Sequence, residues 1–163
     1  KLTKTLEKSG LEIIDANIFT STDDKFAANT FITKFSHHDR AFNQSELKEL
    51  SMRIIKNFNN YDDFSESIKN AKKKIKFQNK LNITNTHNTN KGRNLITIET
   101  SDRPGLLSDI ARVFYDNNLS IFSARINTLG DKVEDTFELE NLNKSLIPNK
   151  KMKEIIASLK KVV

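Results

Sequence analysis

The sequence predicts an α+β protein built from two related modules, each an antiparallel sheet with helices on one face. Three observations predict this class: an internal repeat, period-two alternation of apolar residues in several segments, and a helical apolar period in the segments between them. The element order is that of a βαββαβ unit written twice, with the first unit truncated at its N-terminus. We expect a first module at 1–71, a linker at 72–92 with an extra strand at 81–86, and a second module at 93–163.

An internal repeat relates the two modules. The segments Leu11–Thr20 and Leu119–Thr128 match at a Leu, an Ala, an Ile and a Thr position, and each is followed by a polar turn. Thr30-Phe31 and Thr136-Phe137 then follow at similar distances, with a slightly longer turn in the first copy. The two modules are therefore interpreted as duplicates.

In the first module, Leu2 and Leu6 before Ser9-Gly10 indicate the last turns of an amphipathic helix, so we expect the natural protein to start earlier. Two strands follow, at 11–20 and around Thr30-Phe31. Helices are expected around 47–58 and 62–72. The alternation from Leu81 to Thr86 predicts a hairpin arm that covers the open edge of the second sheet.

In the second module, residues 95–100 are rich in β-forming residues and predict its first strand. In the segment that follows, apolar residues recur at helical spacing and predict a helix, with Asp102 as a possible cap and Pro104 in its first turn. Residues 119–128 and 133–139 alternate as a hairpin. Pro148 opens a last helix. Asp135 falls on the apolar side of the alternation, and a local bulge is the explanation we expect.

Composition limits the classes of function. The chain has 163 residues, 36% of them hydrophobic and 29% charged, and no Cys, which excludes disulfides and cysteine chemistry. No apolar run approaches the roughly 20 residues that cross a bilayer, so we expect no membrane partner and a cytoplasmic location. The net charge of +6 raises nucleic acid as a partner, but the densest basic run, 72–76, is typical of a linker.

Two runs of the second module carry a resemblance to a known family. Residues 99–111 contain the pattern Asp-x-Pro-Gly-Leu-Leu at 102–107, which resembles the opening of an ACT domain, an amino-acid-sensing module with a ferredoxin-like fold. Residues 124–137 read Ala-Arg-Ile-Asn-Thr-Leu-Gly-Asp-Lys-Val-Glu-Asp-Thr-Phe. This run resembles the C-terminal tandem ACT region of the bacterial PII uridylyltransferase/uridylyl-removing enzymes, and residues 15–20, 29–31 and 61–64 of the first copy agree with it.

The resemblance implies a regulatory function for this chain. Enzymes of that family add UMP to a PII-type nitrogen signal protein and remove it again, and their ACT pair senses glutamine. The partners implied are glutamine, the catalytic domains and the PII protein. We expect no catalytic residue and no cofactor in this chain, because the Mg²⁺ of the family belongs to catalytic domains that the sequence does not contain.

The residues at the start of the 106–116 helix suit an amino-acid site. Gly105 lets the backbone approach a ligand, and the amides of Leu106 and Leu107 can hold a carboxylate at the positive end of the helix dipole. Asp102 can take the ammonium group. The resemblance also implies that the sheets or helices of tandem ACT modules pair, so that this turn faces the second strand of the neighbouring module, which adds an opposing wall. The candidate ligand-binding residues are Asp102, Pro104, Gly105, Leu106, Leu107, Asp15, Asn17, Phe19, Arg125 and Asn127.

A structural explanation stands beside each functional one. Asp102 as a helix cap and Pro104-Gly105 as a tight turn would account for the loop without a ligand. Arg125 could pair with Glu134 or Glu138 across the hairpin. His37-His38, His87 and the Asp62-Asp63 pair lack companion ligands, so we expect no metal site.

Two other functions share the predicted fold. The first is an ACT-type dimerisation or docking module that binds no small ligand. The second is RNA binding by a ferredoxin-like repeat, which the acidic residues of the 133–139 segment disfavour because they would repel phosphate.

Overall fold

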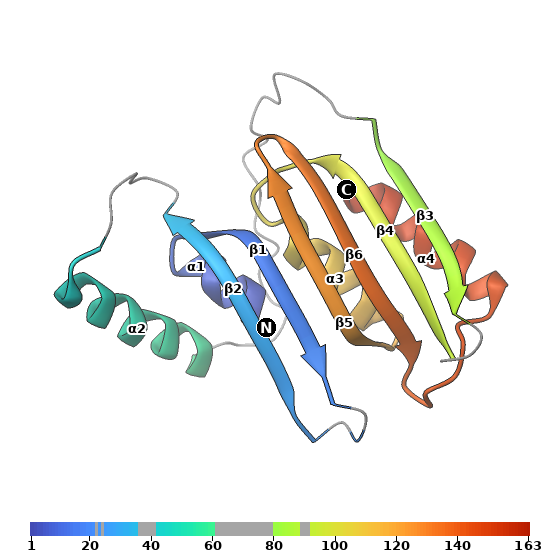
Figure 1. Ribbon diagram of the computed structural model, residues 1–163, viewed down its shortest axis with the longest axis horizontal. Helices are drawn as coiled ribbons and strands as arrows, with labels where there is room; N and C mark the ends of the chain where they lie inside the picture. The colour runs from blue at the N-terminus through green and yellow to red at the C-terminus, as the bar shows by residue number, and fades with distance from the viewer. Residues whose placement is uncertain (22, 24, 36–41, 61–79, 89–91) are drawn as a thin grey trace.

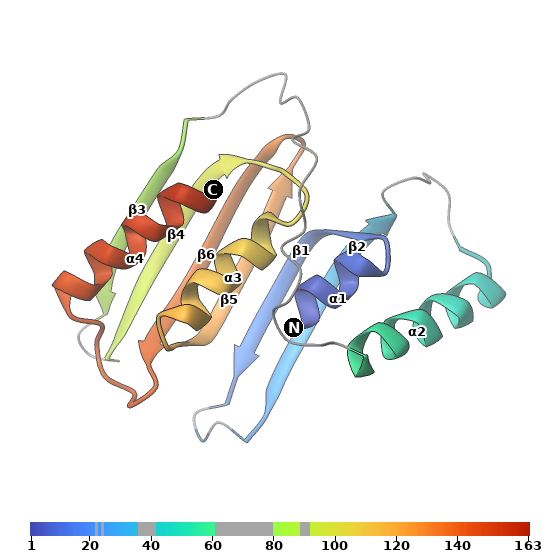
Figure 2. The same ribbon diagram turned by 180° about the vertical axis from the view of Figure 1, so that it is seen from behind.

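A computed structural model describes residues 1–21, 23, 25–35, 42–60, 80–88 and 92–163 of the chain. The described elements form one antiparallel sheet of six strands, with helices on one side and the helix at residues 44–59 beyond one edge (Figures 1 and 2). Their bounds are α1 Leu2–Lys8, β1 Leu11–Thr20, β2 Ala27–Phe35, α2 Gln44–Asn59, β3 Asn82–Asn88, β4 Arg93–Ser101, α3 Leu106–Asp116, β5 Leu119–Leu129, β6 Lys132–Asn141 and α4 Asn149–Val162. The α+β class is confirmed, while the helix expected at 62–72 lies outside the described residues.

The sheet has the strand order β2-β1-β5-β6-β4-β3. The hairpin β1-β2 of the first module is joined to the second module edge to edge, because β1 pairs antiparallel with β5. The two sheets that the sequence predicts are therefore one continuous sheet.

The junction has an approximate two-fold relation between the modules. Asn17 lies opposite Arg125, and these two residues occupy the same position of the repeat. Asp15 accordingly pairs with Asn127, and Phe19 with Ser123. The register of β1 against β2 shifts at Ile14, and that of β5 against β6 shifts at the repeat-equivalent Phe122. The duplication inferred from sequence thus extends to the irregularities of the strands.

The outer edge of the second module is covered by β3. Its seven residues pair antiparallel with β4, with Ile83 opposite Ile98. This confirms the hairpin arm expected at 81–86, and it explains why this part of the chain alternates although it lies between the modules.

The core lies between the second module's sheet and the helices α3 and α4. Phe114 of α3 and Phe137 of β6 form an aromatic contact in this core, with ring centroids 5.0 Å apart in an edge-to-face arrangement. The side chains of the second module with at most 2% exposure that accompany this pair in the core come from five elements and a loop: Ile96, Ile98, Ile110, Ile126, Val133, Leu139, Ile147, Met152, Ile155 and Leu159.

Two local expectations were wrong. Asp102 does not cap α3, because the helix begins at Leu106 and its N-cap is Gly105, in the left-handed region at φ 81°. Asp135 does not mark a bulge, because the register shift of that hairpin lies between Ile121 and Ser123 and β6 runs in regular register against β4 through Asp135. Asp135 is therefore an acidic residue at a regular, buried position of β6.

None of the described helices is long and apolar enough to cross a membrane. Within the described ranges, no group of three or more His, Asp or Glu side chains could hold a metal ion.

Candidate functional site

The loop between β4 and α3 is the first part of the candidate site. The Asp102 N–H donates to the Asp131 carbonyl at 2.9 Å, which fastens the loop to the β5-β6 turn. The Leu106 N–H donates to the Arg103 carbonyl at 3.2 Å, so this amide is already used inside the loop. The side chains of Leu106 and Leu107 are buried in the core. Of the two predicted amide donors, that of Leu107 therefore remains the candidate for an anion.

Arg103 holds the loop against both helices of the module. Its Nη2 donates to Asp109 Oδ2 at 2.5 Å and to the carbonyl of Val162 in the last turn of α4, while Nη1 donates to the Pro104 carbonyl at 3.2 Å. Sequence reasoning passed over this residue, although it stands inside the motif. A charged side chain between two residues of a turn gives no periodic signal that would single it out.

Asp135 lies on the helix side of β6, in line with the buried residues Val133 and Phe137, and only 1% of it is exposed. Its Oδ1 accepts the Asn127 N–H at 3.3 Å. Burial raises the pKa of Asp135 to about 7; the Asn127 hydrogen bond opposes this shift and the nearby Asp102 carboxylate adds to it. Asp102, Asn127 and Asp135 therefore lie close together where the loop meets the sheet, and Asp135 is a site residue that the candidate set lacked.

The strand residues of the candidate set form a second group. Asp15, Asn17 and Phe19 of β1 pair directly with Asn127, Arg125 and Ser123 of β5. Because Ala16 and Ile126 between them face the core, these side chains lie on the face of the sheet without helices. The Asn17 Nδ2 reaches Asp15 Oδ1 at 3.5 Å.

The candidate residues thus fall on two faces of the sheet. Loop residues 102–107 lie where β4 meets α3, whereas Asn17, Phe19 and Arg125 lie on the helix-free face. Asn127 belongs to both groups, since its backbone N–H binds Asp135 and its Cα pairs with that of Asp15. Arg125 is exposed, and no ion pair between it and Glu134 or Glu138 is found among the described residues.

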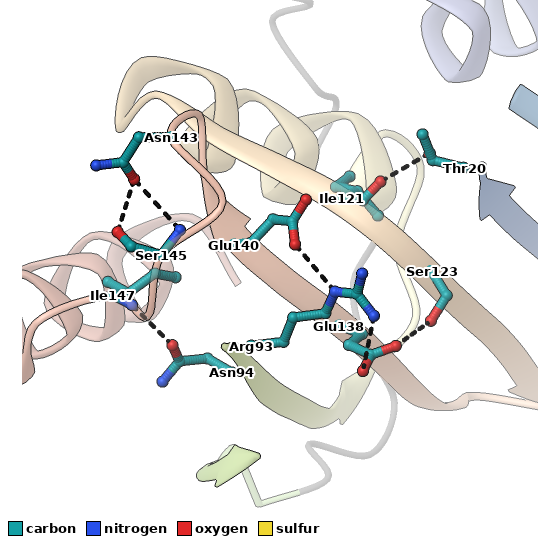
Figure 3. A network of polar contacts seen from close by, with 10 residues as sticks. All are labelled: Thr20, Arg93, Asn94, Ile121, Ser123, Glu138, Glu140, Asn143, Ser145 and Ile147. Carbon is teal, nitrogen blue, oxygen red and sulfur yellow. Dashed lines mark hydrogen bonds and ion pairs between the residues drawn. The ribbon is translucent and has the colours of Figure 1, made fainter. Parts of the chain in front are cut away.

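A polar cluster on the helix-free face includes Glu138 and Glu140 of β6 (Figure 3). Arg93 stacks on Phe122, with the guanidinium carbon 3.2 Å from the ring centroid, and its Nε donates to Glu140 at 2.9 Å. Glu138 lies 3.9 Å from Arg93 Nη1 and accepts the Ser123 hydroxyl at 3.1 Å. Nearby, the Thr20 hydroxyl donates to the Ile121 carbonyl at 3.0 Å and ties β1 to β5 beside the bulge. The contacts of Arg93 and Ser123 therefore link strands within the second module, and the Thr20 hydrogen bond crosses the junction between the modules.

A second link between the modules lies on the helix side. Glu7 of α1 accepts the Ser108 hydroxyl of α3 at 2.9 Å. Burial raises the pKa of Glu7 to about 6; the Ser108 hydrogen bond opposes the shift, and the Asp109 carboxylate adds to it. Because Asp109 also binds Arg103, the loop and α1 are connected through neighbouring residues of one helix turn.

Comparison with known proteins agrees with this architecture. The family model of the ACT domain matches residues 94–146. A bifunctional uridylyltransferase/uridylyl-removing enzyme of a Psychrobacter species is 27% identical over 154 residues, which are 94% of this chain and 17% of that protein. The enzymes of the same name from Pseudomonas aeruginosa (strain LESB58) and Stutzerimonas stutzeri are 32% and 31% identical over 135 residues, 81% of this chain and 15% of each. The chain spans about a sixth of the length of these relatives.

Proposed function

We propose, from the ACT domain that residues 94–146 form and the similarity of most of the chain to uridylyltransferase/uridylyl-removing enzymes, that this chain is the amino-acid-sensing regulatory region of such an enzyme. Glutamine is the favoured effector. The parent enzyme would act on a PII-type signal protein in the cytoplasm, with its chemistry in other domains.

One observation carries the proposal: a buried carboxyl group lies beside the Asp102–Gly105 loop at the start of α3. A free amino acid presents one carboxylate and one ammonium group, so its site needs an anion cradle and an acid a few ångströms apart. The Leu107 N–H and the α3 dipole would hold the carboxylate. Asp102 and Asp135 would hold the ammonium, whose positive charge would relieve the repulsion between them.

The contacts of Arg103 suggest how binding would be transmitted. A ligand held by the loop would favour one position of Arg103, and through Asp109 and the Ser108–Glu7 hydrogen bond one position of α1. An effector changes an equilibrium only by binding one arrangement more tightly than the other. In this proposal the two arrangements differ in how the first module lies relative to the catalytic domains.

Isothermal titration of L-glutamine tests the proposal, using this chain and two alanine variants. Gly105→Ala places a side chain at φ 81° in the loop, whereas Gly10→Ala places one at φ 83° in the α1-β1 turn, where its Cβ would meet only Phe35 at 3.7 Å. Both changes carry similar backbone strain of about 1 kcal/mol. We expect saturable heat from the unaltered chain and from Gly10→Ala, with at least about a tenfold weaker Kd for Gly105→Ala.

The controls decide between the sensor and other functions. L-asparagine and L-glutamate should give weaker heats than L-glutamine. A folded sample that gives no heat with any amino acid would contradict the proposal. Equal loss of binding in both glycine variants would show that strain, and not the loop, is responsible.

A docking module without a ligand is the second candidate, and one observation favours it. The Leu106 N–H already has an acceptor in the loop, and Arg103 ties that loop to α4, so the turn is held closed without a ligand. RNA binding has less support, because Glu138 and Glu140 lie on the helix-free face and Arg93 is engaged by both.

A further inference from the structure

A polar cluster joins α1 of the first module to α3 of the second, where the two helices lie side by side on the helix side of the sheet (Figure 2). Thr3 and Glu7 are four residues apart, so they project from the same face of α1. Ser108 of α3 faces both of them. Its Oγ lies 2.9 Å from Glu7 Oε2 and 3.3 Å from Thr3 Oγ1.

The acid in this cluster is not a residue that the two repeats share. The alignment that pairs Leu11 with Leu119 also pairs Glu7 with Tyr115. Tyr115 is 61% exposed on α3, whereas Glu7 is half-buried against the neighbouring module. The carboxyl group therefore stands where one module meets the other.

The hydrogen bonds of the cluster suit a protonated Glu7 better than an ionised one. A carboxylate can only accept, and it offers about four acceptor positions. Among the described residues, Ser108 is the one hydrogen-bond donor to Glu7. A protonated Glu7 can instead donate to Ser108 Oγ and leave the Ser108 proton for Thr3. That chain satisfies all three groups, while the ionised form keeps partly buried acceptor positions without a donor.

The charges that act on Glu7 come from both modules. Asp109 of α3 disfavours ionisation of Glu7, whereas Arg103 and Lys4 favour it. Arg103 also binds Asp109, so its charge is shared between the two acids. Burial outweighs these charges and disfavours the ionised form of Glu7.

The other elements packed against α1 direct their charges elsewhere. Glu12 and Asp15 of β1 lie on the helix-free face, since Leu11 and Ile13 between and beside them face the core. Arg53 of α2 donates to a backbone carbonyl at the end of α1. None of these three charges is among those that shift Glu7.

We propose that Thr3, Glu7 and Ser108 form a clasp between the modules that a proton closes. A proton on Glu7 completes the hydrogen-bond chain and seats α1 against α3, and loss of this proton loosens the contact. The clasp lies one turn of α3 from the candidate ligand loop, to which Asp109 is tied through Arg103. Its connection with an effector rests on the proposed function, but the clasp itself needs no ligand.

Closing the clasp should take up a proton between pH 4.5 and pH 6. The pKa of Glu7 rises from 4.5 to about 6 when α1 lies against α3, so the closed form holds a proton that an open form has released between these values. The contact should therefore be firmest below about pH 4.5. It should weaken as pH rises to about 6 and change little above that value.

Amide hydrogen exchange measured by NMR at pH 5 and pH 7 tests the clasp. The amides of residues 5–10 report the opening of α1, and those of residues 119–129 report the second module in the same sample. After correction for the intrinsic rates, the opening constant of α1 relative to β5 should be about eightfold larger at pH 7 than at pH 5.

Two glutamine variants separate the proton from the shape of the side chain. Glu7→Gln keeps an acceptor for Ser108 but cannot ionise, so it should remove the pH dependence. At pH 7 it should hold α1 on the order of tenfold more firmly than the parent does. A structural role alone would give the opposite sign, because Glu7→Gln replaces a charged acceptor by a weaker one. Glu49→Gln removes the same charge from an exposed position of α2 and should behave like the parent.

Titration of the Glu7 carboxyl carbon by NMR is a second measurement. The Ser108 hydrogen bond lowers the pKa of Glu7, so Ser108→Ala should move the midpoint above that of the parent. A parent midpoint near 4.5 would overturn the proposal. So would α1 exchange that is indifferent to pH, or looser α1 in Glu7→Gln at pH 7. No amino acid is present in these experiments, so their outcome is independent of the sensor function.

Discussion

At the scale of single residues, the most informative position is the one that violates its strand's pattern. Asp135 occupies a core position in an alternating strand, and its carboxyl group is buried close to Asp102. Burying an acid costs free energy unless a partner compensates for it. A sequence that breaks a local rule in this way often does so at a functional site.

The buried acid makes stability depend on pH. The pKa of Asp135 rises from 3.8 to about 7 on folding, so the folded protein holds a proton that the unfolded chain has released between these values. The free energy of unfolding should therefore fall as pH rises from about 4 to about 7. In Asp135→Asn this slope should be smaller, and the variant should be more stable at pH 8 by on the order of 3 kcal/mol. Urea titrations of both proteins at several pH values measure this difference. Glu7, whose pKa is also raised, contributes equally to the pH dependence of both proteins.

The same group should make ligand binding depend on pH. An ammonium group favours the ionised form of Asp135, so the affinity for glutamine should increase as pH rises through about 7. Calorimetric titrations at pH 6 and pH 8 compare the two forms. A Kd that is the same at both values, with Asp135→Asn behaving like the parent, would remove Asp135 from the ligand site.

At the scale of elements, the equivalent helices α2 and α4 contribute differently to the free energy of unfolding, because α4 covers the described sheet and α2 does not. Leu159→Ala in α4 should cost about 2 to 5 kcal/mol, since it empties a site with no exposure. Leu47→Ala in α2 should cost less than about 1 kcal/mol in this chain, since Leu47 is 48% exposed. Chemical denaturation of both variants measures the difference. Similar losses would mean that α2 packs against the sheet in solution.

At the scale of the whole molecule, the junction β1-β5 makes the first module dependent on the second. Ala16 lies in this junction with 1% exposure, and few other residues of the first module are buried. Ala16→Arg should therefore release the first module while the second stays folded. Ala28→Arg, at an exposed position of β2, should leave both in place.

Calorimetry and hydrogen exchange distinguish these states. The parent and Ala28→Arg should show one thermal transition, and Ala16→Arg should show rapid exchange in 11–35 with protection kept in 119–141. If residues 11–35 stay protected in Ala16→Arg, the first module has a core that does not need β5.

The sequence by itself determined the repeat, the class of each described element and the hairpin arm at the outer edge. These follow from local periodicity, turn residues and spacing, which act over a few neighbours. The motif at 102–107 was also visible, because its Gly and Pro positions are constrained by the backbone alone.

The tertiary structure decided which segments meet. Asn17 pairs with Arg125, and Asp135 is buried beside Asp102, although the partners of each pair are more than 30 residues apart in the chain. Helix α2 has no buried residue because no neighbouring strand covers it among the described residues. Alternation fixes which side chains share a face, but it contains nothing about the strand across the edge. For that reason alternation gave each module a sheet of its own, whereas the fold decided that the described strands of both modules form one sheet through β1 and β5.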